Sequence, residues 1–143
     1  MNSAIREKKV YFVVPGEPQG KLRARWGPRG MYTPQKTINY EVYIKELFVI
    51  KYPDFQPLSG ALGLELTAWV SVPKSTSMRK MELMLSDLIL PTKKPDFDNI
   101  IKTAADALEK LAYKNDNQIV TCTIKKFYSE TPRLEIIIYG ENL

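Results

Sequence analysis

The segment from Leu62 to Val72 constrains the fold most strongly, because apolar and polar residues alternate along nearly its whole length. A period of two places the apolar side chains on one face of a β-strand, so this segment predicts a long, half-buried strand. Pro73, which has no backbone N–H to donate, ends the strand. A sheet with one apolar face needs a second layer of structure to cover that face.

Two segments with helical spacing of apolar residues can supply this layer. They span residues 37–52, which end before Pro53, and residues from about 98 to 112. A shorter helix is expected between residues 74 and 90. Its methionines are suited to a mobile lid or an association surface, although ordinary packing explains them better.

The remaining patterns complete an α+β fold. Strands are expected over residues 10–14, 118–128 and 133–139, the last two joined as a hairpin through residues 130–132. Residues 16–34 are expected to form a long loop. The order of these elements predicts a single domain over residues 1–143, with a small mixed sheet and helices packed on one face.

The composition narrows the chemistry that such a domain can perform. The chain has no histidine, which excludes His-based zinc sites and Ser-His or Cys-His catalysis. Cys122 is the one cysteine, so no intramolecular disulfide forms and a reducing cytoplasm fits. No apolar run is long enough to span a bilayer, and residues 1–9 lack the apolar segment of a signal peptide. A net charge of +5 favours a polyanionic partner.

Charge of both signs is concentrated at a structural junction, residues 92–102. Pro95 favours extended backbone before it and a helix start after it, so Asp96 and Asp98 lie at a helix N-terminus. Helix capping explains one aspartate. It leaves the second aspartate, and the two lysines that precede Pro95, without a role.

These aspartates can belong to a metal centre. Asp116, in the polar turn before the strand at 118–128, supplies a third carboxylate if that turn returns to the same site. Three carboxylates can hold one or two Mg²⁺ ions, which would activate a water to attack a phosphodiester. Lys102, one helical turn beyond Asp98, would assist electrostatically. The alternative for Lys102 is an ordinary ion pair with Asp106.

The loop at residues 16–34 is basic. Residues 10–36 hold one acid, Glu17, against five cations, which are Lys21, Arg23, Arg25, Arg29 and Lys36. Its Arg-Ala-Arg-Trp run, with Tyr32 nearby, combines cations and aromatic rings as nucleic-acid contacts often do. A solvated basic loop with Trp26 packed on the core is an equally good interpretation.

The combined pattern resembles the RusA family of Holliday-junction resolvases, the crossover junction endodeoxyribonucleases. The resemblance rests on three runs, Lys93-Lys94-Pro95-Asp96-x-Asp98-Asn99-x-x-Lys102, then Asp106-Ala107-Leu108, then Asp116-x-Gln118-Ile119-Val120. It implies a homodimer that nicks two opposing strands of a four-way DNA junction symmetrically and needs Mg²⁺, with Mn²⁺ as a substitute. Some relatives carry two adjacent aspartates at the turn, whereas here Asn115 precedes Asp116.

The resemblance also implies roles for individual residues. Asp96, Asp98 and Asp116 would bind the metal, and with Lys102 they would form the catalytic set. The DNA contacts would come from the motif and the basic loop, through Lys93, Lys94, Asn99, Lys21, Arg23 and Arg25. A bacterial or prophage cytoplasm is the expected setting.

Two other functions are compatible with the residues alone. One is a non-catalytic, basic nucleic-acid-binding module whose aspartates only cap a helix. The other is a metal-dependent hydrolase of small molecules. The first predicts salt-dependent binding without a product, and the second predicts indifference to competing DNA.

Overall fold

The structure, a computed structural model, describes residues 5–142; residues 1–4 of the N-terminal segment and residue 143 lie outside the described part. Its strands are β1 (Ile5–Pro15), β2 (Arg25–Gly27), β3 (Gly30–Tyr32), β4 (Leu62–Val70), β5 (Ile119–Tyr128) and β6 (Arg133–Asn142). Its helices are α1 (Gln35–Lys51), α2 (Met78–Leu85), α3 (Phe97–Leu108) and the short 3-10 helix η1 (Asp116–Gln118).

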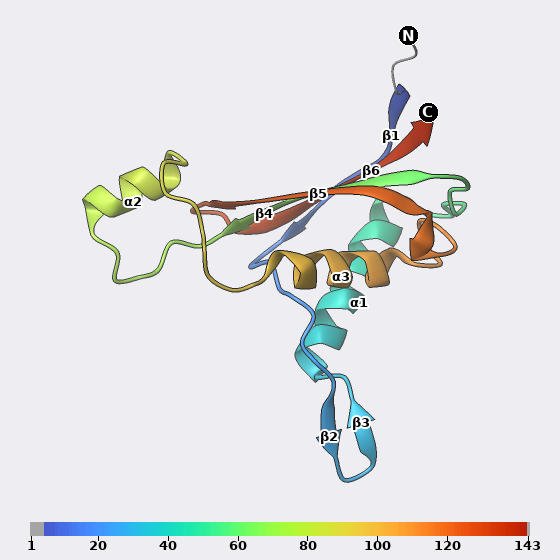
Figure 1. The fold of residues 1–143 in the computed structure, drawn as a ribbon, viewed down its shortest axis with the longest axis horizontal. Coiled ribbons are helices and arrows are strands. Elements are labelled where there is room, and N and C mark those ends of the chain that lie inside the picture. The colour runs from blue at the N-terminus through green and yellow to red at the C-terminus, as the bar shows by residue number, and fades with distance from the viewer. Residues whose placement is uncertain (1–4, 143) are drawn as a thin grey trace.

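Four strands form one mixed sheet in the order β1-β6-β4-β5. β6 pairs antiparallel with both β1 and β4, while β4 and β5 run parallel. Figure 1 shows α1 and α3 on the same side of this sheet, with β2 and β3 extending away beyond them. The expected α+β fold, a mixed sheet with helices on one face, is therefore confirmed for the described residues.

The core lies between the sheet and the two long helices. Alternate residues of β4, from Leu62 to Ala68, are buried, as the period-two pattern predicts. α3 faces the core with side chains that include the small, fully buried Ala104 and Ala107. α1 contributes Tyr40, Ile44 and Phe48 to the same cluster. The core therefore fixes the direction of α3 across the sheet, and with it the position of both ends of that helix.

The expected hairpin between the last two strands is wrong. β4 lies between β5 and β6, and residues 129–132 cross the end of β4, where the Ser129 N–H donates to the Val70 carbonyl. Burial explains this order. The alternate residues Leu134, Ile136 and Ile138 give β6 a fully buried face suited to the middle of a sheet. β5 exposes several polar side chains, as edge strands do.

Two further segments differ from expectation. The basic loop contains a two-stranded hairpin, β2–β3, which is too short to give a periodic signal. α3 ends at Leu108 rather than near residue 112, although its apolar pattern continues. The chain turns at Lys110, whose φ is 72°, and this turn buries Tyr113. The Tyr113 hydroxyl then donates a hydrogen bond to the Ala105 carbonyl inside the core.

We predict that Leu66→Ala lowers the free energy of unfolding by about 2–5 kcal/mol, because Leu66 is fully buried and its truncation leaves a cavity. The measurement is urea unfolding followed by circular dichroism. Thr123→Ala is the control, since Thr123 is exposed on the edge strand and should cost less than about 1 kcal/mol. Equal losses in the two variants would contradict the assignment of the buried face.

Candidate functional site

Asp96 and Asp98 present their carboxylates at the N-terminus of α3. Asp96 occupies the capping position, with φ −70° and ψ 145°, yet its side chain makes no capping hydrogen bond. One carboxylate oxygen of Asp98 accepts from the Asn99 N–H at 3.0 Å. Both residues are exposed. Capping therefore does not occupy the Asp96 carboxylate, which remains available to a ligand.

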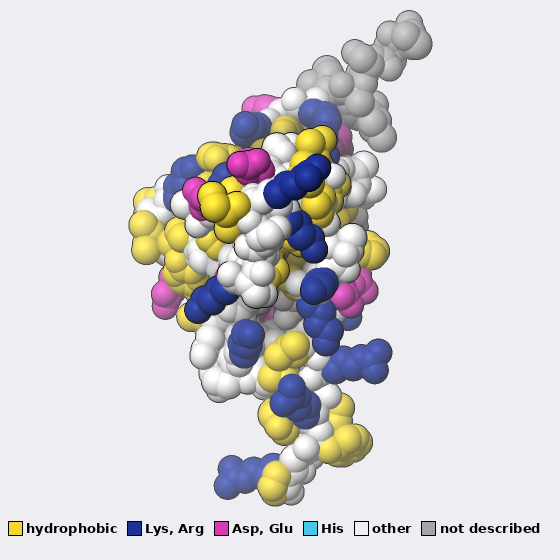
Figure 2. Space-filling model, turned by 90° about the vertical axis from the view of Figure 1, so that its left-hand side faces the viewer, with side chains coloured by type: hydrophobic (Ala, Val, Ile, Leu, Met, Phe, Trp, Pro, Cys, Tyr) yellow, Lys and Arg dark blue, Asp and Glu magenta, His cyan; other side chains and the backbone are white. Residues whose placement is uncertain are grey.

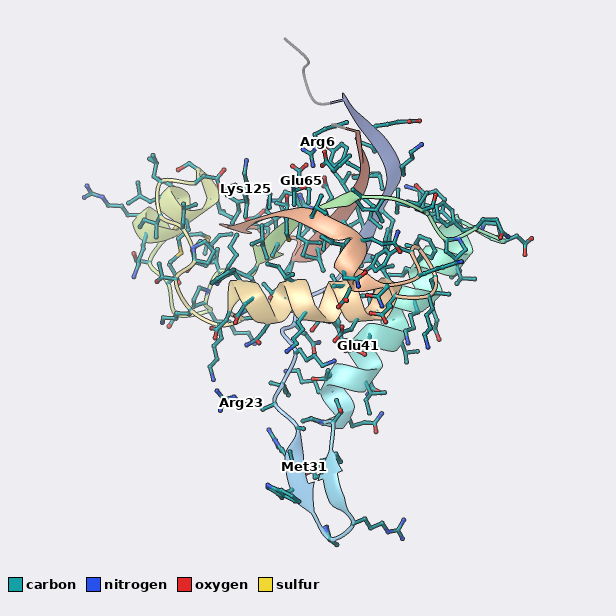
Figure 3. The ribbon with its side chains drawn as sticks, turned by 45° about the vertical axis from the view of Figure 1, so that its right-hand side comes forward. Arg6, Arg23, Met31, Glu41, Glu65 and Lys125 are labelled. Atoms are coloured by element: carbon teal, nitrogen blue, oxygen red, sulfur yellow. The ribbon has the colours of Figure 1, made fainter. Side chains whose placement is uncertain are left out.

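A pocket of about 580 Å³ joins these aspartates to the basic loop. Lys94, Pro95 and Asn99 line it together with the two aspartates, and residues 18–23 and Lys36 line the rest. Figure 3 shows Arg23 below the N-terminal part of α3, at the base of the β2–β3 hairpin. The fold thus brings two segments that are about 75 residues apart in sequence to the same pocket, whose lining combines two carboxylates with cations from both segments.

The basic loop is anchored on the first turn of α3 by a close backbone approach. A Cβ atom on Gly20 would lie 2.8 Å from the Asn99 Cβ, so only glycine fits there. The Lys21 N–H donates to the Asn99 carbonyl at 3.0 Å, and the Leu22 N–H donates to the Thr37 hydroxyl at 3.1 Å. These contacts hold the loop against the N-terminal turns of both α3 and α1.

The Lys21 ammonium lies between two carboxylates. Its Nζ atom is 2.6 Å from Asp106 on α3 and 3.3 Å from Glu41 on α1. The hydrogen bond to Asp106 raises the pKa of Lys21, against the opposing effect of burial, so the side chain stays charged. Asp106 therefore pairs with Lys21, and the alternative ion pair with Lys102 does not form. Lys102 is exposed on α3, with no salt bridge among the described residues.

Lys126 on β5 holds the backbone of residues 93–95, which lead into α3. Its ammonium donates to the carbonyl oxygens of Lys93 and Pro95, at 2.7 and 2.8 Å, from the C-terminal end of β5. The Lys94–Pro95 peptide bond in this segment is cis. Lys93 and Lys94 keep their own side chains exposed. Sequence reasoning missed Gly20 and Lys126 as positioning residues, because their roles depend on contacts between distant segments.

Asp116 lies at the opposite end of α3 from Asp96 and Asp98. One oxygen of its carboxylate lies within 4.8 Å of one oxygen each of Asp106 and Glu109, and those two oxygens are equally close to each other. The eight residues from Asp98 to Asp106 correspond to about 12 Å along a helix. Among the described residues, the structure therefore does not bring Asp116 together with Asp96 and Asp98 in one copy of the chain.

Side-chain hydrogen bonds from Asn115 and Gln118 hold the turn that carries Asp116. The Asn115 side chain accepts from the Asn117 N–H at 2.9 Å, and the Gln118 side chain accepts in return from the Asn115 N–H at 3.1 Å, which forms a capping box. Gln118 also donates to the carbonyls of Leu58 and Gly60. Burial, together with the nearby carboxylates of Asp116, Glu109 and Asp106, raises the pKa of the Tyr113 phenol. The three carboxylates therefore lie close enough to Tyr113 to disfavour its ionised form.

Comparisons with known proteins define the class of this fold and site. The family model described as "Endodeoxyribonuclease RusA" matches residues 15–139, which include both ends of α3, the basic loop and three of the four sheet strands in full or nearly so. The chain belongs to the RusA endodeoxyribonuclease family. It is 36% identical over 135 residues to "Uncharacterized protein YqaN" of Bacillus subtilis (strain 168), an alignment that covers 90% of this chain and 94% of the relative.

We predict that Gly20→Ala detaches the loop from α3, because the new methyl group would meet the Asn99 Cβ at 2.8 Å. Hydrogen exchange of the Lys21 amide, which bonds the Asn99 carbonyl, should accelerate by about tenfold or more.

The matched control is the double variant Gly20→Ala/Asn99→Gly, which removes the opposing Cβ atom and should restore slow exchange. Asn99→Gly alone should keep the Lys21 amide protected, since the acceptor is a backbone carbonyl. Fast exchange in the double variant would show that the close approach is not what requires glycine at position 20.

Proposed function

We propose that this protein is a Mg²⁺-dependent, structure-selective endodeoxyribonuclease that resolves Holliday junctions by paired, symmetric nicks. Its membership of the RusA family supports endonuclease activity on DNA. The observation that carries the proposal is the pocket in which the uncapped Asp96 and its neighbour Asp98 face the basic loop. The cations of the lining suit a phosphodiester backbone, and its carboxylates suit a hard metal ion.

The proposed DNA contacts come from the cations that remain unpaired. Arg23, Arg25, Lys93 and Lys94 form no salt bridge among residues 5–142, and Arg23 and Lys94 line the pocket. Asn99 lines it as well and offers an amide to the sugar–phosphate backbone. The charge of Lys21 is already balanced by Asp106 and Glu41, so we assign Lys21 to holding the loop in place rather than to a strong DNA contact.

The donor set fits Mg²⁺, with Mn²⁺ as a substitute. Carboxylate oxygens are the ligands that these ions prefer, and the proposed ligands Asp96, Asp98 and Asp116 are all exposed. A bound Mg²⁺ supplies an activated water and stabilises negative charge on the phosphoryl oxygen. Lys102, one turn beyond Asp98, would add positive charge beside the same phosphate.

A homodimer would complete each centre. One copy holds its three proposed ligands at opposite ends of α3, about 12 Å or more apart along the helix. A two-fold axis across the middle of α3 would place Asp96 and Asp98 of one copy beside Asp116 of the other. The same symmetry would present two identical centres to the two symmetry-related strands of a four-way junction.

The proposed setting is the cytoplasm of a bacterium or of a cell that carries a prophage. Cys122 is exposed and unpaired, which suits a reducing compartment. Among residues 5–142, no helix has the length and apolar character needed to cross a membrane.

We predict that Asp96→Asn lowers cleavage of a synthetic four-way junction in Mg²⁺ by at least about a hundredfold, because it weakens the metal centre. Junction binding should be kept or tightened, since a negative charge near phosphate is removed. Gel assays with labelled junctions, in Mg²⁺ and in EDTA, measure both properties.

Glu46→Gln is the charge-matched control, because Glu46 is exposed on α1 and forms no salt bridge among the described residues. Cleavage that persists in EDTA, or no cleavage of branched DNA by the wild-type chain in any divalent metal, would refute the proposed activity. A different result would move the metal site: if Asp96→Asn cleaves the junction fully and Glu109→Gln does not cleave it, the metal is assigned to the carboxylates of Asp106, Glu109 and Asp116.

The shared centre makes a second prediction. A dimer of one Asp96→Asn copy and one Asp116→Asn copy would keep one intact centre, formed by Asp96 and Asp98 of the second copy and Asp116 of the first. Differently tagged, co-purified mixed dimers should therefore nick one strand of the junction, whereas each variant alone is inactive. If each copy formed its own centre, the mixed dimer would show no nicking.

A further inference from the structure

The β2–β3 hairpin exposes two large apolar side chains that are paired across its strands. The Trp26 side chain is 81% exposed and Met31 is 54% exposed. Neither residue belongs to the hydrophobic core. Tryptophan gains much free energy from burial, so an indole left this open is typical of a binding surface. The alternative interpretation, in which Trp26 packs on the core, is therefore wrong, and its ring is available to a ligand.

The hairpin has two chemically different faces. Trp26 and Met31 are directly opposite each other in the antiparallel ladder, so their side chains share one face. Arg25 and Tyr32 are the neighbouring pair and share the other face. The Tyr32 ring covers Gly27 there, where an added Cβ would meet it at 3.0 Å. One face is thus free and apolar, while the other combines a cation with a ring packed against the hairpin.

The charge of the hairpin and its base selects a polyanionic ligand. No Asp or Glu occurs from residue 18 to residue 40, whereas five Lys and Arg residues do. On the face drawn in Figure 2 the protrusion at the bottom carries dark-blue and yellow side chains and no magenta ones. A hairpin that bound another protein would be expected to carry some acidic side chains as well. DNA instead presents phosphates beside the apolar faces of its bases, which suits a surface of cations and aromatic rings.

The hairpin also stands at the edge of the proposed active site. Arg23 leads into β2 and Lys36 follows β3, and both line the pocket that contains Asp96 and Asp98. Trp26 lies three residues beyond Arg23, which corresponds to about 10 Å of extended strand. DNA rises about 3.4 Å per nucleotide along one strand. The indole would therefore reach bases roughly three nucleotides from a phosphate held at the pocket.

We propose that Trp26, with Met31 beside it, stacks on a base face that is exposed at the branch point of a DNA junction. This inference rests on the proposed function and adds to it a device for selecting branched DNA. In a continuous duplex each base is covered on both faces by its neighbours, but a branch point interrupts this stack and opens a face to the indole. Stacking on a ring tolerates any base, so this contact selects DNA shape and not sequence.

Tryptophan fluorescence tests the contact directly and without cleavage. Trp69 is the other tryptophan, and Trp69→Phe keeps a ring beside Phe127 while leaving Trp26 as the single emitter. This variant is titrated in EDTA with an immobile four-way junction and with linear duplexes of the same arm sequences. The junction should quench Trp26 emission at saturation, whereas the duplexes should bind with little quenching.

Affinity provides an independent measurement. Trp26→Ala should weaken junction binding by about 5- to 100-fold, as expected for the loss of one stacked base, and leave duplex binding within about twofold. Trp26→Phe should recover part of the junction affinity. Arg25→Ala is the matched control from the opposite face of the hairpin. It should weaken the binding of junction and duplex equally, and it should reduce the slope of log affinity against log salt concentration by the contribution of about one phosphate.

Three results would overturn the stacking contact. These are junction binding without quenching, equal quenching by duplex and junction, and a change from dimer to monomer in Trp26→Ala by light scattering. The last would make the apolar face a contact between copies of the chain. Absence of binding to any DNA would refute both this contact and the proposed nuclease. Junction-specific quenching without cleavage in Mg²⁺ would support the contact and refute the nuclease alone.

Discussion

The packing of α3 against the sheet is the constraint on which the rest of the molecule depends. Ala104 and Ala107 place small side chains in the core, and Ile100 and Leu108 are buried in the same cluster. A helix held in this way is a rigid rod, so its two ends keep fixed positions relative to the strands. The aspartates at its N-terminus and the acidic group at its C-terminus are therefore part of one stiff unit.

The basic loop is added to this unit by contacts of a different kind. Gly20 allows backbone to touch backbone at the first turn of α3, while Lys21 reaches from the same loop to Asp106, two turns further along. The loop is thus attached to α3 at two positions along the helix, Asn99 and Asp106. Glu41 on α1 shares the same ammonium and joins the second helix to this arrangement (Figure 3). Cations that would otherwise move with a long loop acquire a defined position beside the aspartates.

Much of this arrangement could be predicted from the sequence. Alternation in residues 62–72 and helical spacing in residues 37–52 are local signals, and they predict the half-buried strand and its covering helix, which the structure has at Leu62–Val70 and Gln35–Lys51. The Asp96–Asp98 pair was recognisable because a proline and a helix start define its backbone. The match of the family model to residues 15–139 agrees with the resemblance carried by the motif.

The errors share a physical cause, which is that strand order and turns are decided by distant partners. Nothing local in residues 129–132 indicates that β4 lies between the flanking strands. The end of α3 is set by the burial of Tyr113 rather than by a break in its apolar pattern. The location of Asp116 relative to Asp98 depends on the length of that helix. A pattern of carboxylates in sequence therefore does not reveal which of them meet.

The position of β6 in the sheet has a consequence for how the chain acquires its structure. β1 pairs only with β6 in the main sheet, and β6 also separates β1 from β4. On the ribosome, β1 therefore has no partner in the main sheet until residues 133–142 have been synthesised, although it precedes the other described strands. Closing so long a loop is entropically costly and slow, and until β6 inserts, one edge of β4 has no hydrogen-bonding partner. The sheet should thus be completed late, with the edge of β4 open to pairing with other chains until β6 inserts.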